Sequence, residues 1–97
     1  MAKSENNGLK VEKEMEIMNE LGMHARPAAM FVKLANRFTA EIFVRKGDEE
    51  VNGKSIMGVM MLAAGKGTKL KITAVGADAK DAIAEFDKLL KSKFGEE

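Results

Sequence analysis

Three segments of the chain alternate apolar and polar residues with a period of two, and this pattern restricts the fold more than any other feature. They read VEKEMEIMN at 11–19, AEIFVRK at 40–46 and TKLKITAV at 68–75. Because successive side chains of a strand point to opposite faces, each segment predicts a β-strand with one apolar and one polar face. Strands of this kind favour a single sheet with one face in water and the other face covered.

Helical segments are predicted to supply that cover. From about 27 to 38, apolar residues recur every three to four positions, which predicts an amphipathic helix, and Pro27 suits its first position. A short apolar segment, IMGVMMLA at 56–63, follows Ser55, a favoured N-cap residue. A last helix is expected to begin at Asp78 as its cap. Its apolar stripe comprises Ala82, Ile83, Phe86, Leu89, Leu90 and Phe94.

The order of these elements predicts the architecture. KGDEE at 46–50 supplies a turn between the strand at 40–46 and a short returning strand, EEVNG at 49–53. The resulting order, β-α-β-β-α-β-α, is typical of an α+β open-faced sandwich of the split βαβ kind, with helices on one face of one sheet. A chain of 97 residues holds one core. We expect one domain at 10–97, preceded by a flexible polar extension at 1–9.

Composition excludes several classes of protein. Sixteen basic and 15 acidic residues give a net charge of +1, which is too balanced for a protein that binds nucleic acid or anionic membranes. No cysteine and a single histidine leave no zinc site, and no metal or cofactor is expected. No apolar run is long enough to cross a bilayer, and the N-terminus lacks the apolar core of a signal peptide. A cytoplasmic protein without membrane insertion is therefore expected.

The single histidine stands where phosphate chemistry is possible. It lies in LGMHARPAAMF at 21–31, as His24, just ahead of the first helix. A helix N-terminus offers free N–H groups and a partial positive charge, which together bind phosphate. Arg26 adds a permanent cation, which favours a neutral, nucleophilic imidazole. The phosphate-binding helix start is assigned to Ala25, Pro27 and Ala28.

A second interpretation of His24 is structural, because a lone histidine before a helix is commonly an incidental loop residue or a cap. The chain also has no second catalytic base and no nucleotide-binding loop; GKG at 65–67 lacks the spacing of a P-loop. If His24 does act, it therefore carries a group while other proteins supply the catalysis.

Ser55 and the residues after it form a second candidate site. Capping alone would explain Ser55, but a phosphate placed there would also be tolerated at a helix N-terminus. A short helix lying on a sheet cannot bury its whole perimeter, so we expect a partly exposed partner surface. Methionine suits such a surface because it is flexible, although these residues could instead fill the core. The residues concerned are Ile56, Met57, Met60 and Met61.

GMHARPA and NGKSIMGVMML, about thirty residues apart, closely resemble the two motifs of HPr, the histidine-containing phosphocarrier family of the bacterial phosphotransferase system. The resemblance runs from about residue 11 to about residue 94. It implies four antiparallel strands with three helices on one face. It also implies that His24 accepts a phosphoryl group from phosphorylated enzyme I on its Nδ1 atom and passes it to enzyme IIA components, and that Arg26 neutralises the phosphate.

The resemblance further implies regulation and partners. The serine matching Ser55 is phosphorylated in many members by an HPr kinase/phosphorylase, which hampers the relay and alters partner choice, with transcription regulators among the possible partners. A monomer is expected. A paralogue that does not transfer phosphate lacks the histidine, so the presence of His24 disfavours that branch. Sugar uptake and nitrogen-related regulation both stay open, as does a mainly regulatory binding module. A ferredoxin-like domain for small ligands or RNA is disfavoured.

Overall fold

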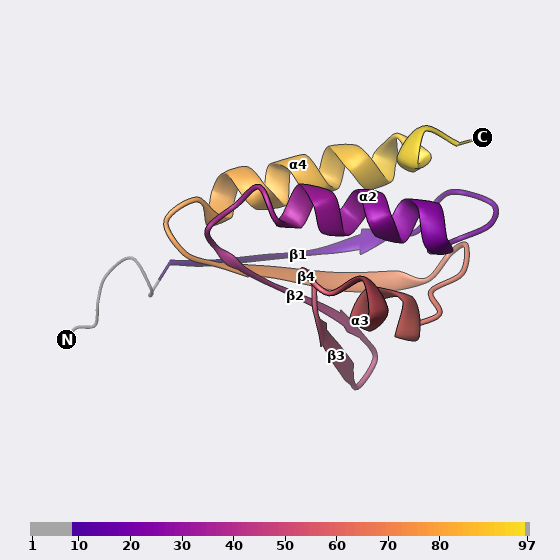
Figure 1. Cartoon of the computed structure of the whole chain (residues 1–97), viewed down its shortest axis with the longest axis horizontal. Helices are drawn as coiled ribbons and strands as arrows, with labels where there is room; N and C mark the ends of the chain where they lie inside the picture. Colours follow the sequence, from indigo (N-terminus) through magenta and orange to yellow (C-terminus); the bar gives the residue numbers. More distant parts are fainter. Residues whose placement is uncertain (1–8, 97) are drawn as a thin grey trace.

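The structure is a computed structural model that describes residues 9–96. Four strands form one antiparallel sheet in the order β1-β4-β2-β3, with three helices on one face (Figure 1). The predicted fold class is therefore confirmed. The elements are β1 (Lys10–Glu16), α2 (Ala25–Ala35), β2 (Glu41–Lys46), β3 (Glu49–Asn52), α3 (Ile56–Met61), β4 (Lys69–Val75), α4 (Ala79–Lys91) and the short 3-10 helix η1 (Lys93–Gly95).

The register of the strands places the predicted apolar positions on one face. Val11 and Ile42 both lie opposite Ala74 of β4, and Met15 lies opposite Leu70. In β2 and β4 the positions with this orientation are buried, whereas in β1 only Met15 is, Val11 being partly buried and Lys13 exposed. The fully or almost fully buried strand residues are Met15, Ile42, Val44, Leu70, Ile72 and Ala74.

Helices α2 and α4 lie side by side over the sheet (Figure 1). Phe31 of α2 and Phe86 of α4 are fully buried and stack with ring centroids 4.4 Å apart. Phe38 packs against the same ring of Phe86 at 6.4 Å. An aromatic cluster therefore fixes the two helices relative to each other and to the sheet.

Helix α2 begins and ends earlier than the sequence pattern predicts. It spans Ala25–Ala35 rather than 27–38, and His24 is its N-cap. Pro27 is consequently its third residue, not its first. This is compatible with proline because the N–H groups of a helix's first turn have no intrahelical partner. The corrected start places His24 directly at the helix end.

Asp78 is the N-cap residue of α4, as predicted, but its side chain makes no capping hydrogen bond. Its carboxylate instead accepts hydrogen bonds from the backbone N–H groups of Thr39 and Ala40, at 2.9 Å each. Desolvation raises the pKa of Asp78, but these bonds outweigh it, so that the pKa lies below its ordinary value. The carboxylate thus joins the start of α4 to the start of β2.

The structure also bears on two predictions for the ends of the chain. Phe94 is buried as expected, but it belongs to η1 with φ +54, not to the stripe of α4. The predicted extension at 1–9 falls almost wholly outside the described residues, so the domain boundary stays a prediction. Among residues 9–96, no helix has the length and apolar content needed to cross a membrane.

Candidate functional site

His24 is held at the start of α2 by a tightly packed loop. Its backbone N–H donates to the carbonyl of Gly22 at 2.9 Å, and Met23 donates to Ala64 at 2.8 Å. Gly22 has φ +70, and a Cβ atom there would lie 2.6 Å from the carbonyl oxygen of Ala64. Only glycine fits both the conformation and the contact. The imidazole itself is 37% exposed, so it is accessible to a partner.

A carboxylate from the other end of the chain contacts the imidazole. Glu96 Oε2 accepts a hydrogen bond from His24 Nε2 at 2.9 Å, and it also accepts from Arg26 Nη2 at 2.9 Å and Nε at 3.1 Å. The sequence analysis missed Glu96 and described only positive charge around the imidazole. Nothing in the pattern of the last residues signals this contact, because it depends on the turn made by η1 after α4.

The contact with Glu96 decides which imidazole nitrogen can react. An ionised carboxylate only accepts hydrogen bonds, so the hydrogen on Nε2 points to Glu96. In the neutral ring Nδ1 then keeps its lone pair. The geometry therefore leaves a lone pair on Nδ1 and holds the ring in one orientation.

A buried asparagine positions Glu96 in turn. Asn19 is 0% exposed, and its Nδ2 atom donates to Glu96 Oε1 and to the carbonyl of Gly22, at 2.8 Å each. Asn19 Oδ1 is buried and has no partner within residues 9–96. The amide group of Asn19 thus joins the segment after β1 to the His24 loop and to the side-chain carboxylate of Glu96. No sequence pattern predicted this role.

Arg26 lies beside His24, and all three nitrogens of its guanidinium group donate hydrogen bonds. Besides Glu96, it donates from Nη2 to the carbonyl of Phe94 at 2.7 Å and from Nη1 to Met30 Sδ at 3.2 Å. The side chain is nevertheless 51% exposed. An anion arriving at His24 therefore meets a cation that already has an anionic partner.

The helix start offers fewer phosphate donors than its sequence suggested. Pro27 has no N–H, and the N–H of Ala28 donates to the carbonyl of His24 at 3.0 Å. Phosphate binding at Ala25, Pro27 and Ala28 stays a prediction, and neither Pro27 nor Ala28 has a free backbone N–H to offer it. The N–H of Ala25 has no partner among the described residues and is the donor next to His24.

The second candidate site lies on α3. Ser55 is its N-cap, and its Oγ atom accepts a hydrogen bond from the Gly58 N–H at 3.0 Å, so the predicted capping role is confirmed. Val59 and Leu62 fill the core, whereas the other apolar residues of the segment are exposed. This exposed apolar patch consists of Ile56, Met57, Met60 and Met61, with exposed fractions between 41% and 70%.

Protonation of Glu96 at low pH should change the NMR signal of the Arg26 Nε–H group, and we expect Glu96→Gln to abolish this change. Desolvation raises the pKa of Glu96, but hydrogen bonds from Asn19, Arg26 and His24 hold it below the ordinary glutamate value. Because the pKa of Glu96 is lower in the folded than in the unfolded state, ionised Glu96 stabilises the folded state at pH values above the ordinary glutamate pKa. This stabilisation is lost as the pH falls through the lowered pKa of the folded state. NMR of the Arg26 Nε–H signal should show a transition with its midpoint below the ordinary glutamate pKa.

The matched control is Glu20→Gln, because Glu20 is exposed, pairs with Lys66 and forms no hydrogen bond or ion pair with Arg26 among residues 9–96. That variant should keep the Arg26 transition, while Glu96→Gln should lose it. An unchanged transition in Glu96→Gln would show that another group titrates beside Arg26.

Fold and site together define a small α+β protein with one four-stranded sheet that presents one imidazole at a helix start. The family described as "PTS HPr component phosphorylation site" matches residues 11–92. The chain belongs to the HPr family. It is 45% identical over 86 residues to a phosphocarrier protein HPr of Neisseria meningitidis, covering 89% of this chain and 97% of that protein.

Two other relatives place the chain within the same family. An HPr-like protein Crh of Halalkalibacterium halodurans is 49% identical over 73 residues, covering 75% of this chain and 87% of the relative. The crystal structure of an HPr from Thermoanaerobacter tengcongensis superimposes with a TM-score of 0.87 at 47% identity, covering 90% of this chain and 98% of that one. The expected monomeric state stays a prediction.

Proposed function

We propose that the protein is a phosphoryl carrier that accepts a phosphoryl group from phosphorylated enzyme I on His24 Nδ1 and passes it to enzyme IIA components in the cytoplasm. The observation that carries the proposal is the contact between His24 Nε2 and Glu96, at 2.9 Å, in a partly exposed ring at a helix start. It leaves Nδ1 as the free nucleophile. Family membership supports a carrier rather than a catalyst.

The transfer needs no proton to leave the imidazole. The lone pair of Nδ1 attacks phosphorus, a nitrogen–phosphorus bond forms, and the bond to the donor breaks with its electron pair returning to the donor. The ring then carries a positive charge that the Glu96 carboxylate stabilises through Nε2–H. Transfer to the acceptor is the same step reversed, so the carrier ends unchanged.

Arg26 must change partners during this cycle. Its donors hold Glu96 and the Phe94 carbonyl before transfer, and the incoming phosphoryl oxygens compete for them. Arginine suits this exchange because its planar group binds either anion through two N–H groups. The N–H of Ala25 adds a donor from the helix start.

The carrier proposal is tested by incubating the protein with enzyme I and phosphoenolpyruvate. We expect a single phosphate per chain that is labile in acid and stable in base, as a phosphoramidate is. Addition of an enzyme IIA component should remove it. Failure to label with an enzyme I that labels another HPr would contradict the proposal.

Arg26→Ala should slow labelling by a factor on the order of 100, because one preorganised cationic donor is lost at the reacting group. Its effect on folding should stay within about 1 kcal/mol, since exposed ion pairs contribute little. Labelling rates and urea unfolding of the same variant measure the two effects. A large loss of stability with normal labelling would assign Arg26 a purely structural role.

A regulatory function is supported by Ser55 standing beside the exposed apolar patch. A phosphate on Ser55 would place about two negative charges next to that patch without unfolding the helix, because negative charge is favoured at a helix start. The modification, by an HPr kinase/phosphorylase, would alter binding of enzyme I and favour other partners such as transcription regulators. Ile56, Met57, Met60 and Met61 would form the shared contact surface.

Ser55→Asp should therefore slow phosphorylation by enzyme I on the order of tenfold, equal to about 1.4 kcal/mol. Aspartate is also a good N-cap residue, so α3 should stay folded. Ser55→Asn caps the helix without a charge and is the matched control, expected to transfer at the normal rate. Equal transfer rates for both variants would contradict the proposal that a negative charge at Ser55 regulates phosphorylation by enzyme I.

A further inference from the structure

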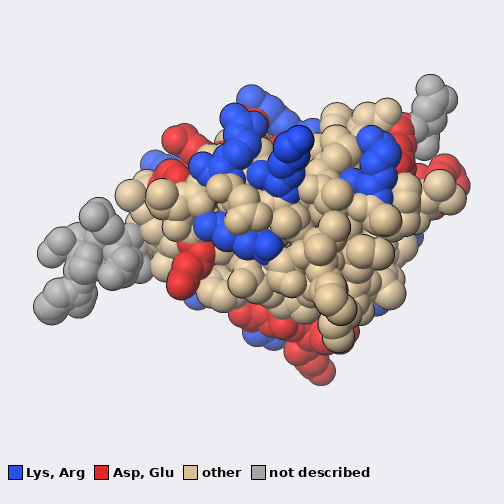
Figure 2. All heavy atoms as spheres, viewed as in Figure 1, with Lys and Arg blue, Asp and Glu red and all other residues tan. Residues whose placement is uncertain are grey.

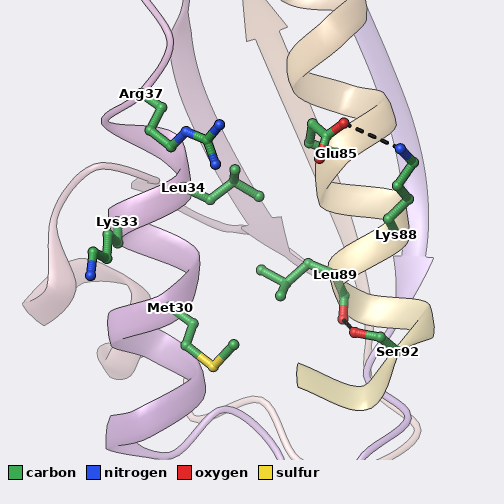
Figure 3. A pocket seen from close by; sticks show the side chains of 8 residues that line it. All are labelled: Met30, Lys33, Leu34, Arg37, Glu85, Lys88, Leu89 and Ser92. Atoms are coloured by element: carbon green, nitrogen blue, oxygen red, sulfur yellow. Dashed lines mark hydrogen bonds and ion pairs between the residues drawn. The ribbon is translucent and has the colours of Figure 1, made fainter. Parts of the chain in front are cut away.

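A groove runs between α2 and α4, and His24 does not line it. Its volume is about 590 Å³, and Figure 3 shows side chains from both helices around it. Met30 and Leu34 extend from α2 toward α4, and Leu89 extends back from α4. These three apolar side chains are half-buried, packed against the core yet open to water.

The rim of the groove is mainly cationic. Lys33, Arg37 and Lys88 are all exposed, and Arg37 points across toward α4 while Lys33 points away (Figure 3). Figure 2 shows lysine and arginine side chains gathered over the face made by α2 and α4. The one acidic lining residue, Glu85, forms an exposed pair with Lys88 at 3.4 Å. Such a pair contributes little and is readily exchanged for another carboxylate.

We propose that this groove docks an acidic amphipathic helix of a protein partner. Met30 and Leu34 lie one turn apart on α2, a rise of about 6 Å, and Arg37 follows in the turn after the last helical residue, Ala35. A partner helix with apolar anchors at i and i+4 presents the same spacing to such a groove. Its apolar side chains would cover Met30, Leu34 and Leu89, and its carboxylates would meet Arg37 and Lys88.

The shape of the groove favours an elongated occupant over a small ligand. Its cationic residues stand at the exposed rim rather than at the bottom, so a small anion would find its charge partners only at the surface. Ligand sites instead enclose most of the ligand and place a few polar groups inside. An amphipathic helix matches both features, since its apolar stripe and its charged flanks lie side by side along its length.

The groove is separate from the His24 site, but one residue, Met30, contacts both. Met30 lines the groove and also accepts the hydrogen bond from Arg26 Nη1 at 3.2 Å. His24, Glu96 and Ser55 are not among the lining residues. Docking in the groove therefore does not require a reactive imidazole, and the two proposals can fail independently.

Two designed 14-residue peptides test the docking proposal. Both carry leucine at helical a and d positions, and the remaining positions are mostly glutamate in one and mostly lysine in the other. Each is titrated into 15N-labelled protein and followed by amide NMR. We expect the glutamate peptide to shift the signals of Met30, Leu34 and Leu89, and the lysine peptide to leave them unchanged.

Charge reversal sharpens the test. Arg37→Glu should weaken binding of the glutamate peptide at least about tenfold, whereas Lys80→Glu, on the exposed start of α4 and outside the lining, should leave it unchanged. His24→Ala should bind the peptide as the wild type does. The proposal is overturned if Arg37→Glu binds normally, if the shifts fall on the exposed apolar patch of α3, or if the groove does not respond at millimolar peptide. A stronger response to octanoate than to the peptide would also overturn it, in favour of a small anionic ligand.

Discussion

Replacing His24 with alanine is expected to abolish acid-labile phosphorylation of this protein by enzyme I and phosphoenolpyruvate. The chain has one histidine and no cysteine, so no other side chain can form a phosphoramidate with an imidazole nitrogen or a thiophosphate. The loss should be complete within detection rather than partial. Labelling with radioactive phosphoenolpyruvate, followed by acid and base treatment, measures it.

His24→Gln is the informative control. The glutamine amide can still donate to Glu96 in place of Nε2, so the contact with the Glu96 side chain is kept while the nucleophilic Nδ1 is lost. Both variants should fold like the wild type, because the imidazole is partly exposed and makes no capping bond through its side chain. Acid-labile phosphate on either variant would refute His24 as the carrier residue.

The strands were predictable from the sequence because their burial pattern is local. Ile42 and Val44 face the core while Glu41, Phe43 and Arg45 lie on the open face of the sheet, so a period of two suffices to assign the faces. The sheet order does not follow from this pattern. Placing β4 between β1 and β2 depends on contacts between segments far apart in the chain.

Helix termini and the anionic part of the site were less predictable. Proline is accepted anywhere in the first turn of a helix, so Pro27 did not mark the residue at which α2 begins. Asp78 occupies the predicted N-cap of α4, but the sequence did not show that its carboxylate bonds to the backbone some forty residues earlier. Glu96 reaches His24 only because η1 turns the chain back after α4, with Phe94 at φ +54. Hydrophobic periodicity cannot predict such a contact for a single polar residue near a chain terminus, such as Glu96.

These long-range contacts explain why the core governs the site. His24 stands at the start of α2, and Glu96 follows α4 through η1. The distance between the two side chains therefore depends on how α2 and α4 pack. The stacked rings of Phe31 and Phe86 fix that packing at the centre of both helices.

Phe86→Ala is accordingly expected to have the largest effect on stability, about 3–5 kcal/mol, because it removes a fully buried ring and leaves a cavity beside Phe31 and Phe38. A domain of this size has roughly 5–15 kcal/mol in total, so this single change should remove a large share of its stability. Urea unfolding followed by circular dichroism measures the loss. The hydrogen bond between His24 and Glu96 should weaken in parallel, which the ring signals of His24 would report.

Phe43→Ala provides the matched control for this truncation. Phe43 lies in β2 on the open face of the sheet and is only partly buried, so removing its ring leaves no enclosed cavity and should cost about 1 kcal/mol or less. The difference between the two variants isolates the contribution of packing between α2 and α4, since both lose the same atoms. Equal losses would mean that the sheet, rather than the stacked rings, holds the two helices in place, and the coupling between core and site would have to be sought there.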